Sequence, residues 1–290
     1  MGTGTVCLTF DFDAVSLWLA RGITAPGPVS RGEFAAIAVP RVLDFLAARQ
    51  IRATWFIPGH TVETYPAECR EVVAAGHEVG LHGYTHELQM PDVATERRVF
   101  ERSRKVVQEL TGRPSVGYRA PGGNLSASTI ELLLEAGIRY DSSLSAHDYR
   151  PYWCRVGDEI PADGPMRFGR ETSLVELPIS WTLDDWAHFE FVREAQVQGL
   201  RSAGSVLENW LADVQYMIRD FEDGVITFVL HPEVIGRGHR FLMLEQLVDT
   251  IAQEGLTFTT LSDVAERFRD GRRYGEYAPQ SRAQTTAMPG

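Results

Sequence analysis

The 290-residue sequence lacks most features that mark secreted, membrane-spanning or nucleic-acid-binding proteins. It has only three cysteines, which are too few and too scattered for a disulfide framework. No apolar run reaches the roughly 18 residues that a membrane-spanning helix needs. Basic residues number 28 against 39 acidic ones, and a net charge of −11 repels phosphate backbones. We therefore expect neither a membrane nor a nucleic acid as a partner.

Two further absences concern the compartment and the fold. The N-terminus has no basic segment followed by an apolar one, so we expect a cytoplasmic protein. No glycine-rich phosphate loop follows the first predicted strand, which argues against a doubly wound nucleotide-binding sheet. The composition itself is that of an ordinary globular protein, with 44% apolar and 23% charged residues.

Strand-like and helical patterns alternate along the chain, which indicates parallel strands joined by right-handed crossovers. Seven or eight such units favour a closed or nearly closed barrel. Residues 22–32 and 141–173 are rich in glycine or proline, and we interpret the second segment as a functional insertion. The predicted strands are 6–10, 53–57, 78–81, 116–118, 138–140, 174–179, 225–230 and 257–260, and the predicted helices are 40–49, 66–75, 92–111, 128–136, 204–221, 241–254 and 262–269.

Titratable side chains follow the carboxyl ends of several predicted strands. In a parallel barrel these ends share one face, and active sites are built on that face. We therefore expect a catalytic site there. The side chains are Asp11 and Asp13 after the first strand, His82 and His86 after the third, Arg119 after the fourth, Asp184 and Asp185 beyond residue 179, and His231 after residue 230.

The two aspartates and two histidines have the spacing of a metal site. Asp11 and Asp13 point to the same side of an extended chain, and two such close carboxylates need a nearby cation unless one stays protonated. A turn and a helix cap explain this pair equally well. His82 and His86 can reach one metal from a single helical turn, although such a pair alone more often binds none. With Asp13 they make two histidines and one carboxylate, a set that leaves positions open for water and substrate.

His231 and Arg119 complete the candidate chemistry. His231 follows a strongly apolar strand and could be an ordinary buried histidine, but its place on the same barrel face favours proton transfer. Arg119 could be a surface cation, yet beside carboxylates it is better interpreted as an ion-pair partner that orients Asp11. Trp181 and Trp186 could serve as core residues or as walls of a pocket.

Four ordered motifs resemble those of the polysaccharide deacetylase family, also called carbohydrate esterase family four. They are Thr9-Phe10-Asp11-Phe12-Asp13, His82 to His86, Arg119-Ala120-Pro121 and Leu230-His231-Pro232. The resemblance covers residues 5 to about 265 and is closest to the intracellular, peptidoglycan-deacetylase-like branch, which includes relatives acting on cyclic ureides or imides. Secreted members have adjacent aspartates and an aromatic residue after the third-motif proline, whereas Phe12 and the Gly122-Gly123 pair stand here.

The resemblance implies an α/β fold, a distorted (β/α)7 TIM-like barrel in a single domain. We expect this domain to cover residues 1–270 and a polar tail, or a contact between subunits, to cover 271–290. The roles implied by the motifs are Asp11 as base, His231 as acid, Arg119 as the brace of Asp11, and Asp13, His82 and His86 as metal ligands. Our candidates for substrate contact are Pro121, Gly122, Trp181 and Trp186.

The function implied is metal-dependent hydrolysis of a non-peptide amide C–N bond, as in the removal of an acetyl group from an N-acetyl sugar. One divalent ion is expected, with zinc as first choice and cobalt, nickel or iron also compatible with the ligands. A cyclic ureide or imide is the alternative substrate, and a non-catalytic metal- or ligand-binding barrel is the alternative from another class. The resemblance also suggests a homo-oligomer. Asp184 and Asp185 match the fourth motif only loosely, so either could act on His231.

Overall fold

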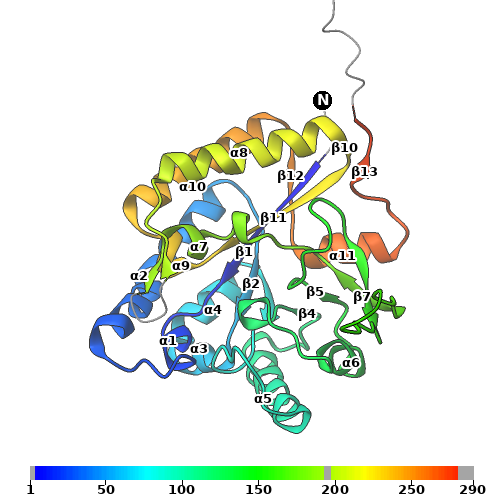
Figure 1. The fold of residues 1–290 in the computed structure, drawn as a ribbon. Coiled ribbons are helices and arrows are strands. Elements are labelled where there is room, and N and C mark those ends of the chain that lie inside the picture. The colour runs from blue at the N-terminus through cyan, green and yellow to red at the C-terminus, as the bar shows by residue number, and fades with distance from the viewer. Residues whose placement is uncertain (1–3, 193–196, 280–290) are drawn as a thin grey trace, which may run out of the picture.

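The computed structural model describes residues 4–192 and 197–279, and nine strands within them form one curled sheet (Figure 1). Neighbouring strands follow the order β11-β1-β2-β3-β4-β5-β7-β6, and β12 (Thr257–Phe258) also pairs with β1. β6 (Tyr152–Val156) is antiparallel to β7, whereas all other pairs in this order are parallel. The parallel strands are β1 (Gly4–Asp11), β2 (Thr54–Ile57), β3 (Glu78–Leu81), β4 (Gly117–Tyr118), β5 (Tyr140–Asp141), β7 (Arg170–Glu176) and β11 (Gly224–Leu230). The predicted distorted (β/α)7 barrel in a single domain is confirmed.

No ladder of the described residues closes the barrel, because the strand order ends at β11 on one side and at β6, beside β7, on the other. Within the described residues, the pairing across this gap consists of one isolated bridge, between Asp184 and Val229. The chain that follows β7 therefore meets β11 beyond the end of the regular ladders. A short helical turn (Trp181–Leu183) and α7 (Asp185–Phe189) occupy this position.

The longest ladder of the sheet joins β1 and β11, which pair over seven successive residues. All residues of both strands are buried, and most are β-branched or aromatic. This continuous burial is typical of a parallel sheet that is covered on both faces. The helices surrounding the sheet are α1 (Ser16–Leu19), α2 (Pro26–Ala48), α3 (Gly59–Thr64), α4 (Pro66–Ala74), α5 (Val93–Thr111), α6 (Thr129–Glu135), α8 (Ala203–Asp220), α9 (Pro232–Ile235), α10 (Gly238–Gln253) and α11 (Leu261–Arg269) (Figure 1).

Helix α2 corrects our interpretation of residues 22–32 as irregular. It begins at Pro26, fourteen residues before the proline that we took for its first turn. A proline is accepted in the first turn because its missing N–H would have no helical partner there. Pro40 instead lies inside the helix, which continues past it because Val39, Val42 and Phe45 bury one face in the core.

The long segment 141–173 is partly regular, contrary to our expectation. It contains β6 and the first residues of β7, which form an antiparallel hairpin at the edge of the sheet. Two further strand pairs lie outside the main sheet. They are β8 (Phe191–Val192) with β9 (Val197–Gln198), and β10 (Phe221–Glu222) with β13 (Glu276–Tyr277).

The beginning of the predicted polar tail packs against the barrel. Tyr274 is buried in a hydrophobic cluster, and β13 pairs antiparallel with β10. Residues 280–290 of the predicted tail lie outside the described residues. No helix in the described part of the chain has the length and apolar character needed to cross a membrane.

Candidate active site

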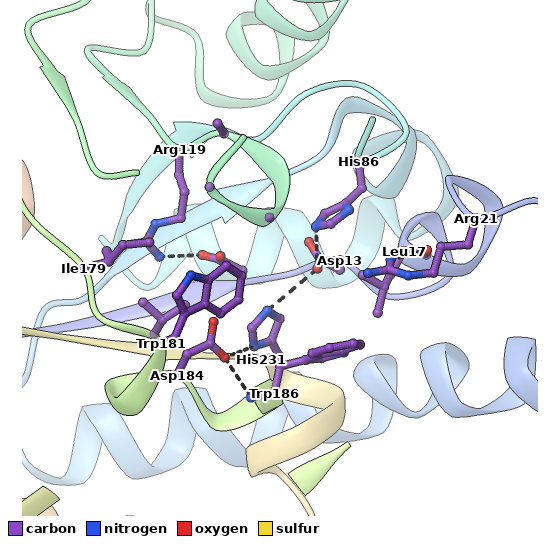
Figure 2. A pocket seen from close by; sticks show the side chains of 15 residues that line it. Asp13, Leu17, Arg21, His86, Arg119, Ile179, Trp181, Asp184, Trp186 and His231 are labelled. Carbon is purple, nitrogen blue, oxygen red and sulfur yellow. Dashed lines mark hydrogen bonds and ion pairs between the residues drawn. The ribbon is translucent and has the colours of Figure 1, made fainter. Parts of the chain in front are cut away.

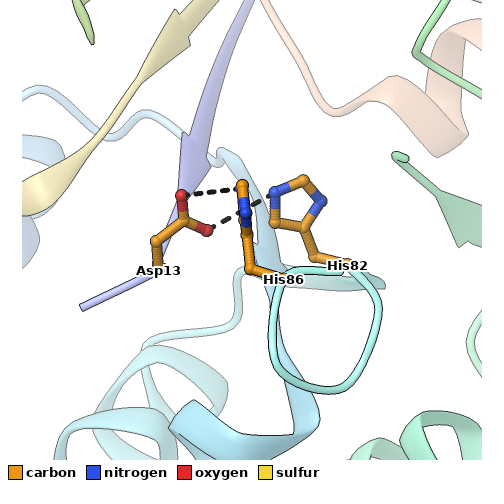
Figure 3. A group of neighbouring side chains, drawn as sticks. All are labelled: Asp13, His82 and His86. Carbon is orange, nitrogen blue, oxygen red and sulfur yellow. Dashed lines mark ion pairs between the residues drawn. The ribbon is translucent and has the colours of Figure 1, made fainter. Parts of the chain in front are cut away.

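Asp13, His82 and His86 meet in the interior at the carboxyl ends of β1 and β3 (Figure 3). One potential ligand atom from each residue lies within 4.8 Å of those of the other two, and all three side chains are buried. Nε2 of His82 is 3.4 Å from Oδ1 of Asp13, and Nε2 of His86 is 3.1 Å from Oδ2. The sequence prediction that these residues gather at one point therefore agrees with the structure.

The segment from His82 to His86 is a loop, so our assumption of a helical turn was wrong. His86 has a φ of 62°, in the left-handed region, and this directs the chain back toward the strand end. The carboxylate of Glu87 holds the loop, because it accepts hydrogen bonds from the backbone N–H groups of Tyr84 (2.9 Å) and Thr85 (2.8 Å). The two imidazoles converge through this turn and not through helical periodicity.

The chemistry of this group fits a divalent cation. Both carboxylate oxygens of Asp13 and Nε2 of His82 are buried without a hydrogen-bond partner, which is costly unless a cation binds them. Nδ1 of His82 donates to the carbonyl oxygen of Arg119 at 2.8 Å, so the lone pair of Nε2 is left for a metal. Burial alone would raise the pKa of Asp13, but the imidazoles of His86 and His82 outweigh it and hold that pKa well below its usual range.

Asp11 and Arg119 form the ion pair that the sequence predicted. Nη1 of Arg119 lies 2.7 Å from Oδ1 of Asp11 and also donates to Oγ1 of Thr9 at 2.8 Å. The other donors of this guanidinium bind Ser142, with Nε on the carbonyl oxygen (2.8 Å) and Nη2 on the hydroxyl (2.9 Å). Because Arg119 is held on all sides, it fixes the orientation of the buried Asp11 carboxylate.

Asp185, and not Asp184, orients His231. Nδ1 of His231 donates to Oδ1 of Asp185 at 2.7 Å, and the backbone N–H of His231 donates to the same carboxylate. Asp184 lies 3.9 Å from Nδ1, and its carboxylate caps α7 by accepting from the N–H of Trp186. Burial would lower the pKa of His231, but the charge of Asp185 and its hydrogen bond outweigh it and raise that pKa well above its ordinary value.

A pocket opens above these groups at the mouth of the barrel (Figure 2). Of the residues that we proposed for substrate contact, Gly122, Trp181 and Trp186 line it, and the Trp181 side chain is 54% exposed at its rim. Pro121 is not part of this lining; it is buried, with its ring beside Gly83. The residues lining the pocket are Asp11, Asp13, Leu17, Arg21, His86, Arg119, Ala120, Gly122, Gly123, Ile179, Trp181, Asp184, Trp186, Val229 and His231.

Two residues of this pocket, Leu17 and Arg21, had no signal in the sequence. Leu17 and Arg21 come from α1 and the turn after it, in a stretch without a recognisable motif. The sequence also did not indicate the unusual acidity of Asp184, whose pKa is raised to about 7 by burial. Its own pattern in the sequence, a pair of adjacent aspartates, did not distinguish it from Asp185.

Comparison with known proteins gives a consistent result. Residues 2–140 match the family model described as polysaccharide deacetylase. A peptidoglycan deacetylase of Helicobacter pylori is 36% identical over 274 residues, which cover 89% of this chain and 94% of the relative. The peptidoglycan deacetylase-like protein FGM2 of Gibberella zeae is 31% identical over 291 residues, covering 91% and 86% of the two chains.

A solved structure is similar over the full length. It is that of a Mycobacterium smegmatis protein assigned to the polysaccharide deacetylases, with a TM-score of 0.80 and 32% sequence identity. The match covers 100% of this chain and 95% of the other. The similarity therefore includes both the strands that carry the aspartates and histidines and the second half of the barrel.

Proposed function

This chain belongs to the polysaccharide deacetylase family, and we propose that it is a metal-dependent hydrolase that removes the acetyl group from an N-acetyl sugar. The observation that carries the proposal is that Asp11 and His231 line one pocket and both approach the buried group of Asp13 and two histidines, with Oδ2 of Asp11 3.7 Å from Nε2 of His82 and Nε2 of His231 3.8 Å from Oδ2 of Asp13. The relatives named as peptidoglycan deacetylases support a glycan amide as the substrate.

Asp13, His82 and His86 would hold the cation, for which zinc is our first choice because the ligands are two imidazoles and one carboxylate. A divalent ion in such a site supplies Lewis acidity, which lowers the pKa of water and stabilises negative charge on an acyl oxygen. The hydrogen bond from His82 to the Arg119 carbonyl fixes the tautomer and ring orientation that a ligand needs.

Asp11 serves as the general base in this proposal. Its Oδ1 accepts a hydrogen bond from Arg119. Its Oδ2 lies toward the group of Asp13, His82 and His86, here called the metal group, and is 3.7 Å from Nε2 of His82. Oδ2 is therefore placed to accept a proton from the water that attacks the acetyl carbonyl carbon. The ion pair with Arg119 holds the carboxylate in this orientation through the reaction.

His231 serves as the general acid. Its Nδ1 is bound to Asp185, so Nε2, which lies 3.8 Å from Oδ2 of Asp13, carries the transferable proton into the pocket. When the C–N bond breaks, the sugar nitrogen takes this proton and leaves as an amine. The raised pKa of His231 favours the protonated imidazole, which is the form that an acid requires.

The test combines metal analysis with turnover of acetylated glucosamine oligomers, allantoin and cyclic imides. Asp11→Asn should lower kcat by about 10²- to 10⁴-fold while the bound metal stays, because only the base is removed. Asp13→Asn should lose metal and activity together. Asp44→Asn, at an exposed position on α2, is the control and should match the parent in both measurements.

The outcomes separate the alternatives. Full activity in Asp11→Asn would contradict the role of the base. Turnover of allantoin or an imide with none of acetylated sugars would replace the deacetylase assignment by that of a ureide or imide hydrolase. A protein that binds metal but hydrolyses none of these compounds would indicate a binding barrel.

A further inference from the structure

Arg21 places a second guanidinium in the lining of the pocket (Figure 2). The side chain is half-buried and lies over the indole of Trp186, with its Cζ atom 5.4 Å from the ring centroid. Nη1 donates to the carbonyl oxygen of Leu17 at 2.9 Å. The aromatic ring and this hydrogen bond hold the guanidinium at the pocket wall.

The two arginines of the pocket differ in how their donors are used. Arg119 uses four of its five N–H groups to bind Asp11, Thr9 and Ser142, and its side chain is almost fully buried. Arg21 is described with the single hydrogen bond to Leu17, and within residues 4–192 and 197–279 it forms no ion pair with a carboxylate. Among the residues that the structure describes, most N–H groups of Arg21 therefore have no partner and can bind a ligand.

The position of Arg21 allows these free donors to contact a substrate. Asp13 and His231 line the same pocket, so a substrate that reaches the metal group also passes the guanidinium. A planar guanidinium with parallel N–H groups fits a carboxylate through two hydrogen bonds. In a pocket lined by several carboxylates of the protein, this cation would also offset the repulsion that an acidic substrate meets.

We propose that Arg21 is a specificity-determining residue that binds a carboxylate of the substrate close to the amide that is cleaved. This inference rests on the proposed function and narrows its substrate class to acidic N-acyl compounds. The carboxylate has two chemical sources, an acidic substituent on an N-acetyl sugar or the carboxyl group of a small N-acyl amino acid.

The experiment measures binding to the zinc-loaded protein by calorimetry, with two matched pairs of ligands. One pair is N-acetylmuramic acid and its methyl ester, and the other is N-acetylalanine and its amide. The parent should bind an acid about 10- to 100-fold more tightly than its neutral partner, since hydrogen bonds to charged groups contribute about 1.5–3 kcal/mol. The pair that shows the larger preference identifies the source of the carboxylate.

Three variants assign the effect to the guanidinium. Arg21→Gln should abolish the preference and leave the affinity for the neutral ligand unchanged, and Arg21→Lys should keep part of it, because an ammonium lacks the planar fork. Arg70→Gln, an exposed arginine on α4, should behave as the parent. The titrations are repeated with protein from which a chelator has removed the metal, so that the carboxylate cannot bind zinc. The preference for the acid over the neutral ligand should persist.

The inference is overturned if the parent does not prefer the acids, or if Arg21→Gln weakens acid and neutral ligands equally, which would make Arg21 a mere support of Trp186. If the protein is not a deacetylase, these measurements give a different set of results. In that case the parent selects the acids through Arg21 but releases no acetate from any acetylated compound.

Discussion

The carboxylate of Asp185 controls the candidate acid through two hydrogen bonds, one from the ring and one from the backbone of His231. Asp184, its neighbour, is engaged at the start of α7 instead. This division matters for the pH dependence of the enzyme. The charge of Asp185 opposes the effect of burial on His231 and is the main reason why the pKa of that imidazole is raised.

Asp185→Asn should therefore move the alkaline limb of the activity profile to lower pH. In its proposed role as the acid, His231 acts in its protonated form, so activity falls as the pH rises through its pKa, and removing the charge that raises this pKa brings the fall to lower pH. We also expect kcat to drop by roughly 10²- to 10⁴-fold. The measurement is kcat/KM between pH 5 and 10.

Asp184→Asn is the matched control for this experiment. Its carboxylate is 3.9 Å from Nδ1 of His231, so its loss should shift the limb less than the loss of Asp185 does. An alkaline limb that stays in place in Asp185→Asn would contradict the assignment of His231 as the acid.

The sequence predicted individual residues well where they directly follow a strand. Asp13, His82 and Arg119 could be found because parallel strand ends must meet on one face. Asp185 could not be separated from its neighbour, because the two stand together at the start of the short helix α7, whose direction depends on tertiary contacts. Arg21 was missed for the same reason, since no periodicity links the turn after α1 to the barrel face.

Helix α2 packs directly against the chain that carries Asp13. A Cβ atom on Gly32 would lie 2.6 Å from the carbonyl oxygen of Ala14, the residue after Asp13. Such a contact cannot form without a shift of the helix or of the loop. The missing side chain at Gly32 thus allows the helix to approach the metal group closely.

Gly32→Ala should lower the free energy of unfolding by about 1–3 kcal/mol, because the overpacked contact outweighs the better helix propensity of alanine. The displaced Asp13 loop should also weaken metal binding. Urea unfolding and zinc titration provide the measurements.

Gly27→Ala, in the first turn of the same helix, is the control. No atom lies within 4 Å of its added Cβ, so stability should be unchanged or rise by up to about 1 kcal/mol. Equal stability of both variants would show that the approach of α2 at Gly32 is not close.

At the level of elements, the sequence predicted the long helices and buried strands but not the irregular segments. The edge strand β6 escaped prediction because its burial is mixed and its partner lies within the same insertion. The early start of α2 escaped because Pro26 and Pro28 are compatible both with a loop and with a first helical turn.

For the whole molecule, the metal group joins loops that are far apart in the sequence, so a cation held there should stabilise the folded barrel. Removal of the bound divalent cation by a chelator should lower the Tm by roughly 5–15 °C, since a ligand that binds only the folded state adds several kcal/mol. Differential scanning calorimetry with and without chelator measures this shift.

Asp13→Asn should be insensitive to the chelator, whereas Asp44→Asn should show the same shift as the parent. A Tm of the parent that does not change on chelation would contradict binding of a cation at this group.

The overall architecture was predictable because alternating strands and helices allow few topologies. The gap between the two ends of the strand order, β6 and β11, was not predictable, because it depends on where the last ladder ends in space. This gap has a mechanical consequence. His231, the proposed proton donor, follows β11, whereas Asp185, which orients it, lies in the chain after β7 on the other side of the gap. The proposed metal ligands instead follow β1 and β3, which continuous ladders join through β2. A motion that widens this gap would separate His231 from Asp185 and stop proton transfer, whereas Asp13, His82 and His86 would stay together and could still hold a cation.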